Sequence, residues 1–258
     1  MLANIIRNAK KTGIGSGGGG IVTDPYGSLP VSGAALWLAG NDSSTLYTDA
    51  GSNAVSQSGD LIYQWNDKSG NSRNAIQATS GSRPTWVTHA NARNNYGAVA
   101  FSGNKKMDSS TSAFSFGTSN FTFECWFKVN VFPPTSGQTY SQFAGQVTSS
   151  TTMGFGVVWT GSRYSIMATT FTVAYFGSTS LSASTWYHAA FVRQSGTLKL
   201  YLNGILDGTY TVSTSISSTA WSVGANTASN FYFNGHLQYI AVYNGQALYT
   251  ANFTPWMS

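Results

Sequence analysis

Short runs in which apolar and polar residues alternate occupy most of the chain from Ala34 onward. The longest is Phe121–Val129, in which every second residue is apolar and the residues between them include Thr122, Glu124 and Lys128. A period of two is the signature of a β-strand that turns one face toward a core. This stretch therefore predicts a long strand, with Phe121, Phe123, Cys125, Phe127 and Val129 facing inward.

Two turn signals divide the apolar stretch between Trp186 and Tyr210. Ser195-Gly196 and Asn203-Gly204 separate three short runs, and Asn-Gly accepts the positive φ angles that a tight hairpin requires. We expect a three-stranded antiparallel meander. In its middle strand, leucines 198, 200 and 202 should face the core, while Lys199 and Tyr201 should face solvent.

Further runs of this kind predict more strands, and no long helical pattern follows residue 12. They lie at residues 36–38, 61–65, 98–101, 155–159, 164–167, 172–176, 221–223 and 235–243. About a dozen strands joined by short polar turns are typical of two antiparallel sheets packed face to face. The sequence thus predicts an all-β sandwich over residues 31–258.

Residues 1–30 differ from the rest and predict a docking tail. Apolar residues at helical spacing are followed by cations and by a glycine-rich tether at 13–20, and a disordered tail is the alternative. The residues expected to contact a partner are Leu2, Ile5, Ile6, Arg7, Lys10 and Lys11.

The composition excludes several classes of protein. Charged residues make up only 8% of the chain, and the net charge of +5 reflects scarce acid, without the basic stripe that nucleic acid requires. No apolar run is long enough to span a membrane, and no secretion signal is visible. The single cysteine, Cys125, is expected to be a buried thiol.

Several motifs, in this order, resemble the laminin-G-like jelly rolls of the concanavalin A-like lectin/glucanase superfamily. They are Ala35-Leu-Trp-Leu-Ala-Gly-Asn-Asp42, Gln64-Trp-Asn-Asp-Lys-Ser-Gly-Asn71, Gly97-Ala-Val-Ala-Phe-Ser-Gly103, Phe121-Thr-Phe-Glu-Cys-Trp-Phe127, Trp186-Tyr-His-Ala-Ala-Phe-Val-Arg193 and Leu200-Tyr-Leu-Asn-Gly204. The resemblance covers about residues 34–258 and implies a jelly-roll sandwich. A basic head and a glycine tether before one such module also resemble virion proteins of tailed bacteriophages.

Catalytic constellations are missing from the pattern. Glycosidases of this superfamily use two carboxylates on one strand, but Glu124 is the only glutamate and no second acid lies near it. His89, His188 and His236 are far apart, and no serine-hydrolase elbow or zinc ligand set accompanies them. We therefore expect no enzyme.

Calcium is the one cofactor that the resemblance leaves open. Some laminin-G-like modules hold Ca²⁺ at a sandwich rim through aspartate and backbone carbonyls. Asp67 and Asp207 are the candidates, and turn formation is the alternative role for each.

Exposed aromatics beside polar loops indicate a glycan site, because sugars stack on aromatic rings. The candidates are Trp159, Tyr164, Trp221 and Tyr232, and burial in the core or in an interface is the alternative for each.

Together these features predict a non-enzymatic bacteriophage virion protein, either a capsid decoration or a fibre or tail adhesion module. Residues 1–20 would attach it to other virion proteins during assembly in the host cytoplasm, and its jelly roll would face cell-surface polysaccharide. Low surface charge favours a homo-oligomer. The alternatives are a soluble or cell-surface lectin with Ca²⁺ dependence and, third, a glycoside hydrolase.

Overall fold

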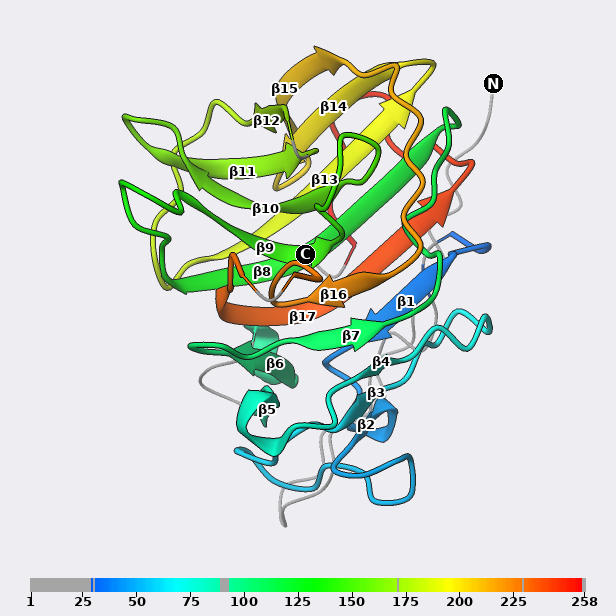
Figure 1. The fold of residues 1–258 in the computed structure, drawn as a ribbon, viewed down its shortest axis with the longest axis vertical. Coiled ribbons are helices and arrows are strands. Elements are labelled where there is room, and N and C mark those ends of the chain that lie inside the picture. The colour runs from blue at the N-terminus through cyan, green and yellow to red at the C-terminus, as the bar shows by residue number, and fades with distance from the viewer. Residues whose placement is uncertain (1–28, 30, 89–92, 171, 229, 257–258) are drawn as a thin grey trace.

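Two antiparallel sheets packed face to face form the molecule (Figure 1). The computed structural model describes residue 29 and residues 31–88, 93–170, 172–228 and 230–256. The predicted docking tail at residues 1–20 lies outside these residues. Within them there is no α-helix, only the short 3₁₀ helices η1 (Ser43–Thr45), η2 (Ser80–Ser82) and η4 (Arg93–Asn95). None of these described helices has the length or apolar character of a membrane span.

An eight-stranded sheet contains the predicted meander. Its order is β15-β14-β13-β8-β17-β6-β5, and β1 also pairs with β17. Its strands are β1 (Leu36–Ala39), β5 (Thr85–Val87), β6 (Ala98–Phe101), β8 (Phe121–Val131), β13 (Trp186–Gln194), β14 (Thr197–Leu202), β15 (Ile205–Thr211) and β17 (Asn234–Asn244).

A nine-stranded sheet forms the other layer, in the order β12-β11-β10-β9-β16-β7-β4-β3-β2. Its strands are β2 (Leu46–Tyr47), β3 (Gln64–Trp65), β4 (Ala75–Ile76), β7 (Met107–Ser109), β9 (Tyr140–Gly145), β10 (Gly154–Trp159), β11 (Tyr164–Thr169), β12 (Ala174–Phe176) and β16 (Trp221–Val223). The predicted sandwich of two antiparallel sheets is confirmed.

The core between the sheets is rich in phenylalanine. Phe123 of β8 stacks on Phe155 of β10 with ring centroids 4.2 Å apart, and Phe191 of β13 packs against both rings. The alternation of β8 is confirmed, because all five residues predicted to face inward belong to this core. Cys125 is a buried free thiol, and burial raises its pKa well above the usual value.

The meander β13-β14-β15 is confirmed together with its turn chemistry. Asn203 and Gly204 both have positive φ, at 50° and 79°. Ser195 and Gly196 at the other turn also have positive φ. These are the angles of a two-residue hairpin whose twist matches the flanking strands.

The solvent-facing side of this meander was predicted wrongly. Tyr201 is fully buried, because residues 247–256 cross the outer face of the eight-stranded sheet and pack on it through Tyr249 and Phe253. Trp256 lies farther along the same face, where its backbone carbonyl accepts a hydrogen bond from Trp126 Nε1 at 2.9 Å. This sheet therefore has apolar side chains on both faces.

Two predicted strands are shorter than expected. In residues 61–65 only Gln64 and Trp65 belong to β3, while Leu61 makes an isolated bridge to Thr85. In residues 172–176 only the last three form β12. Both segments lie toward the ends of the nine-stranded sheet, where fewer neighbouring strands extend the pairing.

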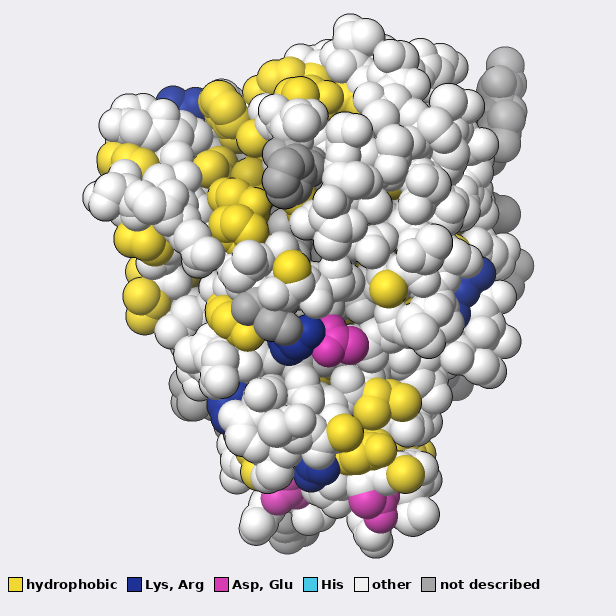
Figure 2. Space-filling model, in the orientation of Figure 1, with side chains coloured by type: hydrophobic (Ala, Val, Ile, Leu, Met, Phe, Trp, Pro, Cys, Tyr) yellow, Lys and Arg dark blue, Asp and Glu magenta, His cyan; other side chains and the backbone are white. Residues whose placement is uncertain are grey.

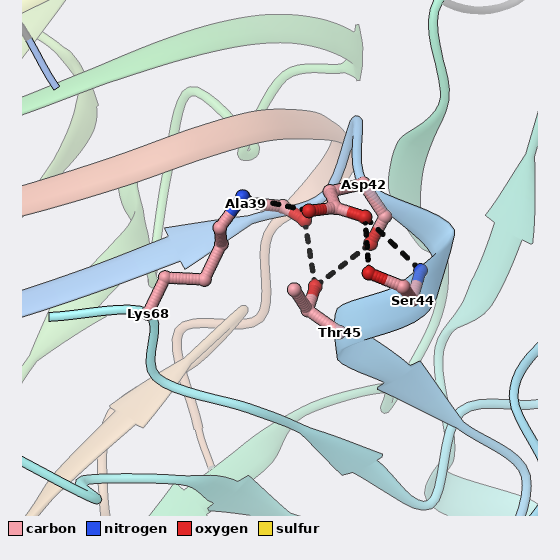
Figure 3. A network of polar contacts seen from close by, with 5 residues as sticks. All are labelled: Ala39, Asp42, Ser44, Thr45 and Lys68. Carbon is pink, nitrogen blue, oxygen red and sulfur yellow. Dashed lines mark hydrogen bonds and ion pairs between the residues drawn. The ribbon is translucent and has the colours of Figure 1, made fainter. Parts of the chain in front are cut away.

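A polar network holds the turn after β1 (Figure 3). The Asp42 carboxylate accepts hydrogen bonds from the Ser44 backbone and hydroxyl, and it forms an ion pair with Lys68 at 2.6 Å. Thr45 Oγ1 donates to the backbone carbonyls of Ala39 and Asp42. Burial alone would raise the pKa of Asp42, but the bonds from Lys68 and Ser44 outweigh it and lower the pKa.

Candidate functional site

A depression of about 350 Å³ opens on the outer face of the nine-stranded sheet. Two loops border it, one between β9 and β10 and one between β16 and β17, and the second loop lies in front of the sheet in Figure 1. Its lining includes Tyr140, Val147, Thr148, Asn226, Asn230 and Phe231.

One wall of the depression is aromatic. Tyr140, the first residue of β9, stacks on Phe231 with ring centroids 3.9 Å apart and planes 11° from parallel. Phe231 has a positive φ of 55°, which an L-residue adopts at a cost. Its carbonyl accepts the backbone N–H of Gln142 at 3.0 Å, and this bond fixes the loop against β9. Burial raises the pKa of Tyr140, so its hydroxyl stays a neutral donor.

An unsatisfied amide lies on the same strand as Tyr140. Gln142, two residues after Tyr140 on β9, is fully buried, and among the described residues neither its Nε2 nor its Oε1 has a hydrogen-bond partner. Gly154 leaves the space that this amide occupies, because a Cβ there would lie 2.9 Å from Gln142 Nε2 and 2.8 Å from Val147. Buried polar groups are nearly always paired, so this amide is an exception within the described part of the chain.

The loop between β16 and β17 adds further amides. Asn226 Oδ1 accepts the backbone N–H of Asn230 at 3.1 Å, and this bond closes the loop. Asn230 Oδ1 is buried and has no partner within the part of the chain that the structure describes. Aromatic rings beside unpaired amides suit a ligand with apolar faces and many hydroxyls.

The four residues predicted to bind glycan do not meet in this depression. Trp159 and Tyr164 form a separate half-buried cluster with Phe132, whose ring stacks on Tyr164 at 4.1 Å. Trp221 is fully buried, so its ring has no open face for a sugar. Tyr232 is half-buried next to Phe231 but does not line the depression.

Tyr140 and Gln142 were missed by the sequence analysis. The run Tyr140-Ser-Gln-Phe-Ala-Gly145 is short and mixed, so it gave no clear strand pattern. The available signal was the cluster of asparagine and aromatic residues at 226–232, which contains Asn226, Asn230 and Phe231.

Asp67 serves the fold. Its Oδ1 accepts the backbone N–H groups of Trp37 and Ser69, both at 2.9 Å, and its Oδ2 accepts the Ser69 hydroxyl and the Arg73 backbone N–H. Four donors hold the carboxylate in place between β1 and the turn after β3. These contacts give Asp67 a role in the fold, and its calcium role stays a prediction.

Asp207 lies in β15 and not in the turn that was predicted. It occupies a bulge, where Tyr201 pairs with Leu206 and Leu200 pairs with Gly208. Its buried Oδ1 accepts from the Ser178 hydroxyl and from the backbone and hydroxyl of Thr179, while Oδ2 lies against Gly177. This carboxylate joins β15 to the chain after β12, and its buried Oδ2 has no hydrogen-bond partner among the described residues, so the calcium role of Asp207 stays a prediction. The described residues contain no group of three or more His, Cys, Asp or Glu placed to hold a metal.

Glu124 is fully buried on the outer face of β8, under the C-terminal segment. Its Oε2 accepts the Tyr249 hydroxyl at 2.7 Å and lies 3.4 Å from His188 Nε2, which in turn is 3.3 Å from the Tyr239 hydroxyl. A carboxylate closed in this way has no access to a substrate.

Comparison with known proteins agrees with this architecture. A family model described as the concanavalin A-like lectin/glucanases superfamily matches residues 101–251. None of the curated proteins resembles the chain closely enough to count as a match.

Several solved structures share the fold at low sequence identity. Domain 4 of the extracellular arabinanase AbnA from Geobacillus stearothermophilus, in complex with arabinotriose, has a TM-score of 0.53 at 14% identity, and the match covers 84% of this chain and 94% of that one. An arabinofuranosidase complexed with arabinofuranosyl-xylobiose has a TM-score of 0.58 at 14% identity, with 84% and 56% covered. The binding domain of Paraclostridial Mosquitocidal Protein 1 has a TM-score of 0.54 at 15% identity, with 74% and 48% covered. The match thus spans about half the length of the last two chains.

Proposed function

Because this chain belongs to the concanavalin A-like lectin/glucanases superfamily, we propose that it is a non-catalytic carbohydrate-binding protein whose site is the Tyr140–Phe231 depression. The observation that carries the proposal is the stacked pair of Tyr140 and Phe231 beside Asn230, all of which line the depression. Asn230 Oδ1 is buried and has no protein partner among the described residues. Sugars present hydroxyls and apolar C–H faces, and this pairing suits both.

The absence of a carboxylate around the depression supports binding without cleavage. None of the described residues that line it is acidic. Glycoside cleavage requires one carboxyl group to protonate the leaving oxygen and a second to attack or to activate water. Glu124, the only glutamate, is enclosed under the C-terminal segment.

The test is a binding measurement with a wall variant. Phe231→Ala is expected to weaken affinity at least about tenfold, because it removes an aromatic contact at the centre of the site. Arabinotriose, the sugar bound in the arabinanase domain structure, is the first probe, followed by an array of neutral glycans. Phe176→Ala is the matched control, since Phe176 is 39% exposed on β12, away from the depression.

Two results would contradict this function. If no neutral glycan binds at millimolar concentration, the carbohydrate site is wrong. If the protein releases sugar from a glycan that it binds, the non-catalytic assignment is wrong, and Glu124→Gln would then show whether the buried glutamate takes part.

The virion location, the docking role of residues 1–20 and the homo-oligomer remain predictions. Their basis is the N-terminal tail, which lies outside the described residues, and the low charge of the chain.

A further inference from the structure

The C-terminal segment, residues 247–256, lies on the eight-stranded sheet without pairing as a strand. The last strand, β17, ends at Asn244, and none of the described residues of the segment belongs to a helix or a strand. Gly245 follows β17 with a φ of 82°, and a Cβ there would meet nothing within 4 Å. Chain that is bonded to a fold only at separate points opens at a lower free energy than the strands beneath it. The segment can therefore leave the sheet while the sandwich stays folded.

Backbone amides at each end of this segment bond to the sheet and its hairpin turn. The Leu248 N–H donates to the Thr122 hydroxyl at 3.0 Å, and the Phe253 N–H donates to the Gly204 carbonyl at 2.9 Å. Both bonds break when the segment leaves the sheet, and these amide hydrogens then exchange with water. Their exchange rates thus report directly on the position of the segment.

A carboxyl group and an imidazole are enclosed together under the segment. The side chains of Glu124 and His188 are both fully buried, with Oε2 and Nε2 3.4 Å apart. The Tyr249 hydroxyl covers them from the segment and donates to Glu124 Oε2 at 2.7 Å. Glu124 Oε1 and His188 Nδ1 have no hydrogen-bond partner among the described residues. No further bond in the described chain is therefore available to balance a change of charge on either group.

Other titratable side chains lie on this face of the sheet. Burial, and then the Glu124 carboxylate, raises the pKa of Tyr239, Tyr243 and Tyr249, so these hydroxyls stay neutral. Side chains that carry charge or titrate elsewhere on the face are Arg93, which stacks on Trp126, Lys128, which lies over Trp186, Lys199, which donates to the Thr250 carbonyl, and His236. Because histidine ordinarily titrates near neutral pH, His236 requires a control in any test of pH dependence. Charge is sparse elsewhere too, and on the face of the molecule in Figure 2 charged side chains form only small, isolated patches.

The net charge of the Glu124–His188 pair depends on how many dissociable protons it holds. With one proton the pair is neutral overall, either as carboxylate and imidazolium or as carboxylic acid and imidazole. With no proton it is negative, and with two it is positive, so that a charge without a counter-charge is enclosed under the segment. Such a charge is costly inside a protein, and two groups this close titrate as a unit. Opening of the segment relieves the cost, because water then reaches the pair.

From this arrangement we propose that the C-terminal segment is a pH-controlled cover, held on the sheet while the Glu124–His188 pair holds one dissociable proton and released when the pair holds none or two. Release exposes the aromatic outer face of the sheet, including Trp126, Tyr201 and Tyr239. The device is independent of the Tyr140–Phe231 depression, which lies on the other sheet.

The experiment is amide hydrogen exchange of the full chain from about pH 4 to about pH 9, with the intrinsic pH dependence of exchange divided out. Protection of the Leu248 and Phe253 amides is expected to pass through a maximum inside this range and to fall at least about tenfold toward both ends. Glu124→Gln should lose the fall on the alkaline side, because glutamine never becomes a carboxylate. It should keep the fall on the acid side, because His188 still takes up a proton. The double variant Glu124→Gln/His188→Gln should have a flat profile, and it tests the proposal even if the single variant does not fold.

His236→Gln is the matched control and should keep the maximum and both falls, because His236 lies outside the pair. A flat profile in the wild-type chain would overturn the proposal. So would an alkaline fall that persists in Glu124→Gln, or a profile of the double variant that still depends on pH. Loss of the acid fall in His236→Gln would assign that fall to His236 and would equally contradict the role of the pair.

Discussion

At the scale of single residues, the buried polar groups separate into two kinds. Glu124 is an acidic group that the fold encloses and pairs through Oε2, with Tyr249 donating to it and His188 close by, while its Oε1 has no partner among the described residues. Gln142 is a neutral amide that the fold encloses and leaves unpaired. The first kind holds the C-terminal segment on the sheet, and the second also includes Asn230 Oδ1, which lines the proposed ligand site.

Tyr249→Phe should therefore lower the free energy of unfolding by about 3 kcal/mol, because a buried carboxylate loses its shortest hydrogen bond. Burial, and then the charge of Glu124, raises the pKa of Tyr249, so its hydroxyl is a donor at every pH of interest. Urea unfolding at neutral pH measures the loss. Tyr232→Phe is the control and should change stability by less than about 0.5 kcal/mol. Equal effects of the two variants would show that the Glu124 contact contributes nothing.

At the scale of elements, the two hairpin turns of the meander use the same backbone angles in different surroundings. Gly196 and Gly204 have φ of 78° and 79°. A Cβ on Gly196 would meet nothing within 4 Å, whereas a Cβ on Gly204 would collide with the backbone carbonyl of Phe253. The second turn thus supports the C-terminal segment as well as the hairpin, and the Phe253 N–H donates to the Gly204 carbonyl at 2.9 Å.

Gly196→Ala should cost about 1 kcal/mol, which is the strain of an alanine at positive φ. Gly204→Ala should cost at least about 2 kcal/mol, because the carbonyl of Phe253 must also move. Thermal unfolding of the two variants side by side measures the difference. Equal losses of stability in the two variants would show that the C-terminal segment does not pack closely against this turn.

At the scale of the whole molecule, stability should fall in two stages as the pH decreases. Burial, and then the charge of Lys128, lowers the pKa of His236 to about 4 from an ordinary 6.5. Between pH 6.5 and 4, the unfolded chain therefore binds a proton at this histidine that the folded chain does not bind. The free energy of unfolding falls as the pH decreases through this window. Below it, hydrogen bonds keep the pKa values of Asp42, Asp49 and Asp60 under 3.8, and their contributions are lost as they protonate.

His236→Gln should abolish the first stage, since glutamine does not titrate. Relative to the variant, the wild-type chain should lose about 3 kcal/mol between pH 6.5 and 4. Urea unfolding at several pH values in this range measures the difference, and His236→Asn is a second neutral variant in case glutamine packs poorly. Parallel curves for the wild type and both variants would contradict the burial of a neutral His236.

The sequence by itself determined the features that depend on neighbouring residues. Alternation in β8 placed its phenylalanines in the core, and Ser195-Gly196 and Asn203-Gly204 set the turns of the meander, because side-chain direction and φ are local properties. The same local signals predicted two antiparallel sheets. They also predicted a strand at 61–65 that is longer than the one in the structure.

The tertiary structure alone decided which faces are covered and which polar groups are paired. Tyr201 and Glu124 alternate outward like surface residues, and only the return of residues 247–256 buries them. The sequence around Asp207 predicted a turn, whereas in the fold Asp207 lies in a bulge of β15. Tyr140 and Gln142 lie on β9, whereas Phe231 lies on a loop distant in the chain. Their meeting depends on how the nine-stranded sheet packs its loops, which the alternation along one strand does not indicate.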